Sequence, residues 1–234
     1  MAILIFDFDG TIHDSMCIYA PAVRACHRKL VAEGLMPERE ISDAQIRSYL
    51  GLTAMDMWKD FAPDLTEQQH EEGSQFIYRE MTRLALEGKA KLYDGAREVL
   101  TVLKEQGHYL VFLSNCSQGY MDLHAGIFGL NRYFDEMYCS GQFDWIEKWQ
   151  IIKQLIPAWK TLPAWTPDPL IIAVGDRYKD MEIVNAVPPE QKKRFMRTVF
   201  CAYGFGEASE GQQADAVAES VKELPDCISI IQPC

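Results

Sequence analysis

Acidic and small polar residues cluster at three widely separated places in this 234-residue chain. The clusters are Asp7-Phe-Asp9-Gly10-Thr11, Ser114-Asn115, and Gly175-Asp176 with Asp180 beyond. Two neighbouring carboxylates repel each other unless a cation or a proton lies between them. Hard divalent cations prefer oxygen ligands, and Mg²⁺ is the usual one where phosphate is the partner. A hard divalent cation therefore suits the paired aspartates of the first cluster.

The first cluster has the spacing of a site at the end of a strand. In an extended strand Asp7 and Asp9 would project to the same side. Gly10 has no Cβ, so the backbone there can turn sharply and approach a ligand. A single carboxylate after a strand most often caps a helix or forms a turn, and the same explanation fits Ser114-Asn115. Three such clusters, in order at strand ends, favour a shared functional site.

Short apolar runs precede the clusters and predict buried strands. The expected strands cover residues 2–8, 109–113, 136–139, 170–174 and 198–202. Helical patterns separate or follow them at about residues 96–107, 118–127, 146–156, 181–186 and 220–231. Apolar strands that alternate with amphipathic helices predict an α/β fold with a parallel sheet covered on both faces. Ligands of such sheets bind beyond the carboxyl ends of the strands, where the clusters lie.

The segment between the first two clusters has a different pattern. Apolar residues recur there at helical spacing, with breaks near residues 34–37, 51 and 62–64. A structureless loop of this length is implausible in a compact domain. We therefore expect an inserted helical subdomain.

Four motifs in order resemble the haloacid dehalogenase-like (HAD) hydrolase superfamily. They are FDFDGT at residues 6–11, LSN at 113–115, a lysine before a helix, and GDxxxD at 175–180. The chain is most similar to phosphoglycolate phosphatase-like members with a helical cap between the first two motifs, and segments 92–100, 133–135 and 202–206 extend the resemblance. It implies a Rossmann-like three-layer core with a parallel sheet, residues 1–14 and 89–234, and an inserted α-helical cap, residues 15–88.

The resemblance also implies catalytic roles. Asp7 would be the nucleophile that forms an aspartyl-phosphate. Asp9 would protonate the leaving oxygen and then act as the base that activates water. Ser114 would hydrogen-bond the transferring phosphoryl group. The residues expected beside the phosphate, partly through backbone N–H groups, are Gly10, Thr11 and Asn115.

Mg²⁺ is the cofactor that the resemblance implies. The carboxylates of Asp7 and Asp176 and the backbone carbonyl of Asp9 would bind it. Asp180 would support the metal or the motif lysine. All four aspartates are therefore expected at the metal site.

The third motif requires a lysine, and two candidates exist. Lys148 directly precedes a predicted helix, and Lys153 lies further along it. Many relatives have Lys-Pro at this place, which this chain lacks. A lysine at a helix start is most often simply solvated, so only its place between the other motifs supports a role; we favour Lys148.

Two further positions carry a weaker signal. Arg47 begins an RxxxG stretch that ends at Gly51 and resembles one that relatives place near the substrate. Its guanidinium could bind a second anionic group, or it could be an exposed helix arginine followed by a glycine cap. His13 follows the first motif, and we interpret it as a local contact rather than a catalytic group.

Charge and cysteine content limit the partners and the location. Asp and Glu number 34 against 23 Lys and Arg, a formal net charge of −11. This surplus argues against nucleic acid or an anionic membrane as the main partner. The seven cysteines lack paired spacing, and the apolar start is too short for a signal segment or a membrane span. We expect a cytoplasmic protein.

The leading hypothesis is a Mg²⁺-dependent phosphatase that acts on a small phosphorylated metabolite. A phosphomutase could use the same aspartyl-phosphate, and a non-catalytic binding protein on this fold is a third alternative. The substrate and the oligomeric state stay open. Two stretches depart from the family pattern, residues 157–169 and 188–194, and could shape a substrate entrance or a partner surface.

Overall fold

The computed structural model describes residues 1–162, 165 and 169–232. The chain divides into two compact units. One is an α/β unit formed by Met1–Asp14 and Leu92–Cys234, and the other is a helical unit formed by Ser15–Lys91.

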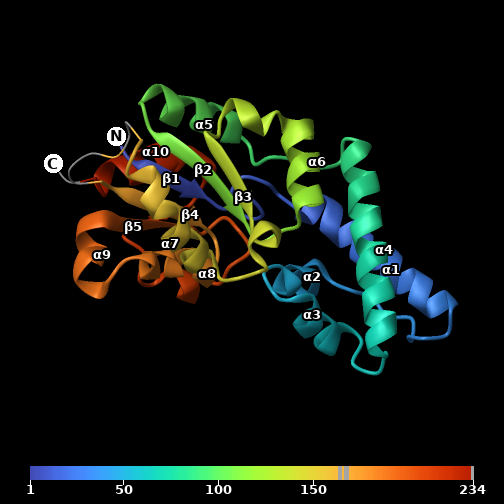
Figure 1. Ribbon diagram of the computed structural model, residues 1–234. Coiled ribbons are helices and arrows are strands. Elements are labelled where there is room, and N and C mark those ends of the chain that lie inside the picture. Colours follow the sequence, from blue (N-terminus) through green and yellow to red (C-terminus); the bar gives the residue numbers. More distant parts are fainter. Residues whose placement is uncertain (163–164, 166–168, 233–234) are drawn as a thin grey trace. The chain divides into compact units, whose positions relative to one another are not determined.

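A parallel sheet forms the centre of the α/β unit (Figure 1). In the described part of the chain it has six strands: β1 (Ile3–Phe6), β2 (Tyr109–Ser114), β3 (Glu136–Cys139), β4 (Ile171–Gly175), β5 (Met196–Cys201) and β6 (Ala216–Ala218). Their order is β3-β2-β1-β4-β5-β6, and every neighbouring pair is parallel. The four central strands β2, β1, β4 and β5 are nearly wholly buried, as the apolar runs predicted. The edge strand β6 was not predicted, because it has only three residues and is shorter than the apolar runs that mark the buried strands.

Helices cover both faces of this sheet (Figure 1). The α-helices of the unit are α5 (Ala96–Glu105), α6 (Gln118–Phe128), α7 (Lys148–Trp159), α8 (Tyr178–Met181), α9 (Pro189–Phe195) and α10 (Leu224–Ile230). Short 3₁₀ helices are η1 (Leu130–Arg132), η2 (Ser140–Phe143), η3 (Glu182–Ala186), η4 (Ala208–Gly211) and η5 (Val221–Glu223). Ile3 and Ile5 of β1 pack in one core cluster with Ile151 and Ile152 of α7. The predicted α/β fold class is confirmed.

The helical unit contains α1 (Met16–Ala32), α2 (Asp43–Tyr49), α3 (Ala54–Phe61) and α4 (Glu67–Leu86). Side chains of Ser42, Thr53 and Thr66 accept backbone N–H groups at the starts of α2, α3 and α4. Such caps satisfy donors that have no partner inside the helix. Trp58 is buried against Gly73 of α4, where a Cβ would overlap the indole. The unit therefore has its own core.

The two stretches that depart from the family pattern differ in what can be described. Residues 157–159 end α7, whereas residues 163–164 and 166–168 lie outside the described residues. In the second stretch, Pro189–Phe195 forms the helix α9, with proline at its first position. Phe195, the last residue of α9, packs against the core cluster of the sheet. The stretch therefore belongs to the packed α/β unit.

Within the described residues, every helix is too short or too polar to cross a bilayer. Six described cysteines are free thiols.

Candidate active site

The first cluster lies in a tight turn rather than in a strand. The expectation that the strand extends to Phe8 is wrong: β1 ends at Phe6. The carbonyl of Phe8 instead accepts hydrogen bonds from the backbone N–H groups of residues 11–13 at 2.9–3.2 Å. Gly10 has φ 84°, and its N–H donates to the carbonyl of His13 at 2.9 Å. That N–H is used within the turn, whereas the sequence suggested that it contacts the phosphate.

Three aspartates from distant parts of the chain meet at the carboxyl edge of the sheet. The backbone N–H of Asp7 donates to the carbonyl of Val174 in β4 at 2.9 Å. Asp176 directly follows β4, and Asp180 lies in α8. One carboxylate oxygen of each aspartate lies within 4.8 Å of the others, and all three residues are buried. Among the described residues, this is the one group of His, Cys, Asp and Glu whose spacing could hold a metal ion.

Lys148 joins two members of this triad. Its Nζ donates to Oδ1 of Asp7 at 2.7 Å and to Oδ1 of Asp180 at 2.6 Å. The Lys148 side chain is only 3% exposed, because α7 begins at this residue and packs on the sheet. Lys153, the other candidate, is exposed on the same helix. Of the two lysines, the structure brings Lys148 to the aspartates.

Three buried carboxylates share the single ammonium group of Lys148. Burial, and next the charge of Asp180, raise the pKa of Asp7 well above its ordinary value, while Lys148 opposes the shift. Burial and Asp180 also raise the pKa of Asp176 to about 7. Burial would lower the pKa of Lys148, but the charges of Asp180 and Asp7 outweigh it and raise that pKa. One ammonium does not compensate three buried carboxylates, so the site favours a further cation.

Asp176 is held from several sides. Its Oδ2 accepts the backbone N–H of Phe205 at 2.7 Å, and its Oδ1 accepts the hydroxyl of Thr11 at 3.4 Å. A Cβ on Gly10 or on Gly204 would overlap the Asp176 side chain. Thr11 is fully buried. Its hydroxyl therefore supports Asp176, whereas the sequence suggested that Thr11 lies beside the phosphate.

This close packing makes Gly204→Ala a sensitive test of the site. The added methyl would meet the Asp176 side chain and the carbonyl of Gly10, so we expect a loss of about 1–3 kcal/mol in unfolding free energy. Gly126→Ala is the matched control, because Gly126 is an exposed position inside α6 with nothing near its would-be Cβ. That control should be neutral or stabilise by about 0.5–1 kcal/mol. Urea denaturation of both variants makes the measurement, and equal stabilities would contradict the packing argument.

The carboxylate of Asp9 lies outside the triad. Its Oδ1 accepts two hydrogen bonds, one from Nδ1 of His13 and one from the hydroxyl of Tyr120, each at 2.8 Å. Burial would raise the pKa of Asp9, but the hydrogen bond and charge of His13 outweigh it, and the pKa lies below its ordinary value. The role of its backbone carbonyl at a metal stays a prediction. Sequence reasoning assigned no role to Tyr120, since nothing in its spacing links it to Asp9.

The remaining predicted residues lie as follows. Ser114 is the last residue of β2 and is buried, and Asn115 after it is exposed. Oδ1 of Asn115 accepts the hydroxyl of Ser140 at 2.5 Å, which orients the amide. Arg47 lies in α2 of the helical unit, and its expected contact with substrate stays a prediction.

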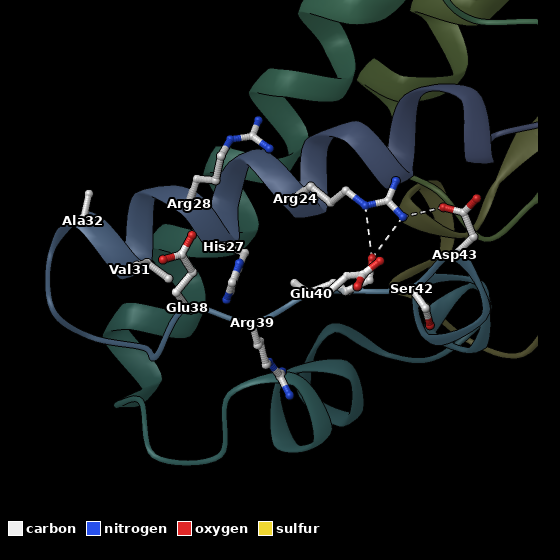
Figure 2. A pocket seen from close by; sticks show the side chains of 11 residues that line it. Arg24, His27, Arg28, Val31, Ala32, Glu38, Arg39, Glu40, Ser42 and Asp43 are labelled. Carbon is white, nitrogen blue, oxygen red and sulfur yellow. Dashed lines mark hydrogen bonds and ion pairs between the residues drawn. The ribbon is translucent and has the colours of Figure 1, made fainter.

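A separate hollow of about 710 Å³ lies within the helical unit (Figure 2). Figure 2 shows Arg24 directed at Asp43, and its guanidinium also donates to the carbonyl of Ile41 at 3.0 Å. Nε2 of His27 contacts the carbonyl of Pro37 at 3.2 Å. These polar groups hold segment 36–43 against α1, so we assign the hollow a structural role.

Comparison with known proteins agrees with this arrangement. The family model described as haloacid dehalogenase-like hydrolase matches residues 4–186. The chain therefore belongs to the haloacid dehalogenase-like hydrolase family, as the motifs suggested. No curated protein shows significant similarity to it.

Solved structures share the fold along the whole chain. A haloacid dehalogenase-like hydrolase from Streptococcus pneumoniae is 20% identical, with a TM-score of 0.74 and 99% of each chain covered. A protein described as a predicted phosphoglycolate phosphatase from Haemophilus somnus is 19% identical, with a TM-score of 0.74, 99% of this chain and 98% of that one covered. A protein from Thermotoga maritima assigned as a β-phosphoglucomutase is 16% identical, with a TM-score of 0.68, 99% of this chain and 100% of that one covered. At these identities the likeness shows the fold.

Proposed function

We propose that this chain is a Mg²⁺-dependent phosphatase that hydrolyses a small phosphorylated metabolite through an aspartyl-phosphate on Asp7. The observation that carries the proposal is the environment of Asp7. Its carboxylate lies at the carboxyl edge of the sheet, among two further carboxylates and an ammonium group. Membership of a hydrolase family and structural neighbours described as phosphatases support the same reaction class.

The donor set fits Mg²⁺. Asp7, Asp176 and Asp180 offer carboxylate oxygens within 4.8 Å of one another, which is the chemistry that this cation prefers. Bound there, Mg²⁺ would neutralise charge on the phosphoryl oxygens. The excess of buried negative charge favours such a cation even without substrate.

Asp7, Asp9 and Lys148 would each have a separate role in the reaction. An oxygen of Asp7 forms a bond to phosphorus while the bond from phosphorus to the leaving oxygen breaks, and Asp9 gives its proton to that oxygen. Water then forms a bond to phosphorus, the bond to Asp7 breaks, and the proton from water returns to Asp9. Lys148 orients Asp7 and offsets negative charge, which is the main catalytic requirement of phosphoryl transfer.

A panel of phosphorylated metabolites tests this proposal. Each is incubated with the protein, with and without Mg²⁺, and released phosphate and isomerised product are measured together. We expect phosphate release that depends on Mg²⁺. An isomerised product without net phosphate release would indicate a phosphomutase, and binding without either product would indicate a binding protein.

Removal of the cation gives a separate prediction. Excess chelator should stop phosphate release, and added Mg²⁺ should restore it, since the carboxylates would otherwise repel the substrate phosphate. Mg²⁺ should also raise the unfolding midpoint, as any ligand of the folded state does. Asp176→Asn, which keeps the side-chain shape, should weaken that rise. Turnover that persists in excess chelator would contradict the metal assignment.

A further inference from the structure

Only one of the two carboxylate oxygens of Asp9, the acid–base residue of the proposed reaction, accepts hydrogen bonds from the described part of the chain. Both hydrogen bonds to the Asp9 side chain end on Oδ1, and Oδ2 has no hydrogen-bond partner among the described residues. Oδ1 carries no hydrogen and only accepts hydrogen bonds, both when Oδ2 carries the proton of the acid step and when it does not, so Nδ1 of His13 carries the hydrogen in this contact. The Asp9 side chain is 29% exposed, whereas His13 is fully buried. Asp9 is therefore partly accessible, and its hydrogen bonds leave Oδ2 without a partner among the described residues.

The two donors are themselves fixed. The His13 ring stacks on Phe8 with ring centres 4.8 Å apart, and the ring of Phe128 lies 5.7 Å away. Tyr120 comes from α6 and packs edge-on against Phe8 at 6.4 Å. Side chains packed in this way have little room for another rotamer, because protein cores contain few voids.

The backbone of the turn fixes His13 as well. Its N–H donates to the carbonyl of Phe8, and its carbonyl accepts the N–H of Gly10, both at 2.9 Å. His13 also forms single β-bridges with Asp9 and with Leu92. The donor that holds Asp9 thus lies on a segment tied at three places within the same unit.

We infer that His13 and Tyr120 are positioning residues that hold Asp9 by Oδ1, so that Oδ2 exchanges the proton with the leaving oxygen and then with water. This inference rests on the proposed function, because it assigns a support to the acid–base group of that reaction. A carboxylate held by one oxygen can present the other in a constant direction, which proton transfer requires. Both steps of the reaction then use the same oxygen.

The inference predicts a change in how the rate depends on the leaving group. Without the hydrogen bonds to Oδ1, proton delivery fails, and substrates that need a protonated leaving oxygen suffer most. We expect Tyr120→Phe and His13→Leu to lower kcat/KM for 4-methoxyphenyl phosphate about tenfold to a hundredfold. For 4-nitrophenyl phosphate, whose leaving group needs no proton, kcat/KM should change little.

A second readout concerns the water step, which needs Asp9 as a base with every substrate. In the two variants, 4-nitrophenyl phosphate should give a burst of about one nitrophenol per enzyme, followed by slow turnover as the aspartyl-phosphate accumulates. His13→Asn should restore much of the loss, because its amide can donate from near the place of Nδ1. Phe128→Leu is the packing control, since this ring contacts His13 and makes no hydrogen bond to Asp9.

The experiment measures kcat/KM for a series of phenyl phosphates from 4-nitrophenyl to 4-methoxyphenyl, with the wild type and the four variants. The expected result is a steeper dependence on leaving-group acidity in Tyr120→Phe and His13→Leu than in the wild type and Phe128→Leu. Equal slopes in all proteins would overturn the inference while leaving the phosphatase intact. A wild type that releases no phosphate from any phosphate ester would instead overturn the proposed function.

Discussion

Asp7→Asn is expected to reduce phosphate release by about 10⁴-fold or more. The amide keeps the shape of the carboxylate but cannot attack phosphorus, and no other described carboxylate lies in an equivalent position next to Lys148 and at the end of β1. The fold should persist, because the substitution changes neither volume nor the backbone contact to β4. Activity on an aryl phosphate, together with urea denaturation, checks both expectations.

The control for this variant is Asp94→Asn. Asp94 is exposed and pairs with Lys222 on the surface of the α/β unit. A surface pair contributes little, so the control should retain wild-type turnover and stability. If Asp7→Asn turned over substrate as fast as Asp94→Asn, Asp7 would not be the nucleophile.

Lys148→Met is expected to have the second-largest effect, and it should affect both activity and stability. Met keeps the length of the side chain but leaves Asp7 and Asp180 buried without their shared cation. Breaking a buried pair in this way costs about 3–5 kcal/mol. Loss of the charge that offsets the phosphoryl group should lower kcat by about 10²–10³-fold.

Lys153→Met is the matched control on the same helix. Lys153 is exposed, so its replacement should change stability by no more than about 0.5 kcal/mol and leave turnover unchanged. Denaturation midpoints and turnover numbers of Lys148→Met and Lys153→Met test these expectations. If Lys148→Met proved as stable and as active as Lys153→Met, the role of the lysine in the site would be wrong.

The α/β fold could be predicted because five of the six described strands have a local sequence pattern. Apolar runs such as Leu170–Val174 and the acidic residues at their ends are readable without any knowledge of pairing. The edge strand β6 escaped prediction, because three residues with alternating exposure do not differ from a loop in sequence. The sheet order also depends on long-range pairing, which residue spacing alone does not contain.

In the candidate site, the aspartates could be predicted from the sequence, but the partners of Asp9 could not. Asp7 and Asp176 directly follow β1 and β4, and Asp180 lies in α8 four residues after Asp176, so their meeting follows from the geometry of a parallel sheet. The contact between Tyr120 and Asp9 joins residues 111 positions apart and depends on how α6 packs, which no local pattern records. His13 was interpreted as a local contact, and it is one, but its partner is the side chain of Asp9.

Phosphoryl transfer through a covalent intermediate on Asp7 is the central step of the proposed reaction. Its most direct test mixes the protein and Mg²⁺ with a radiolabelled phosphate ester, stops the reaction with acid within milliseconds, and locates the label by peptide mapping. We predict transient labelling of the N-terminal peptide that carries Asp7, and no labelling in Asp7→Asn. Phosphate release without any labelled peptide, or a label on another residue, would contradict the account.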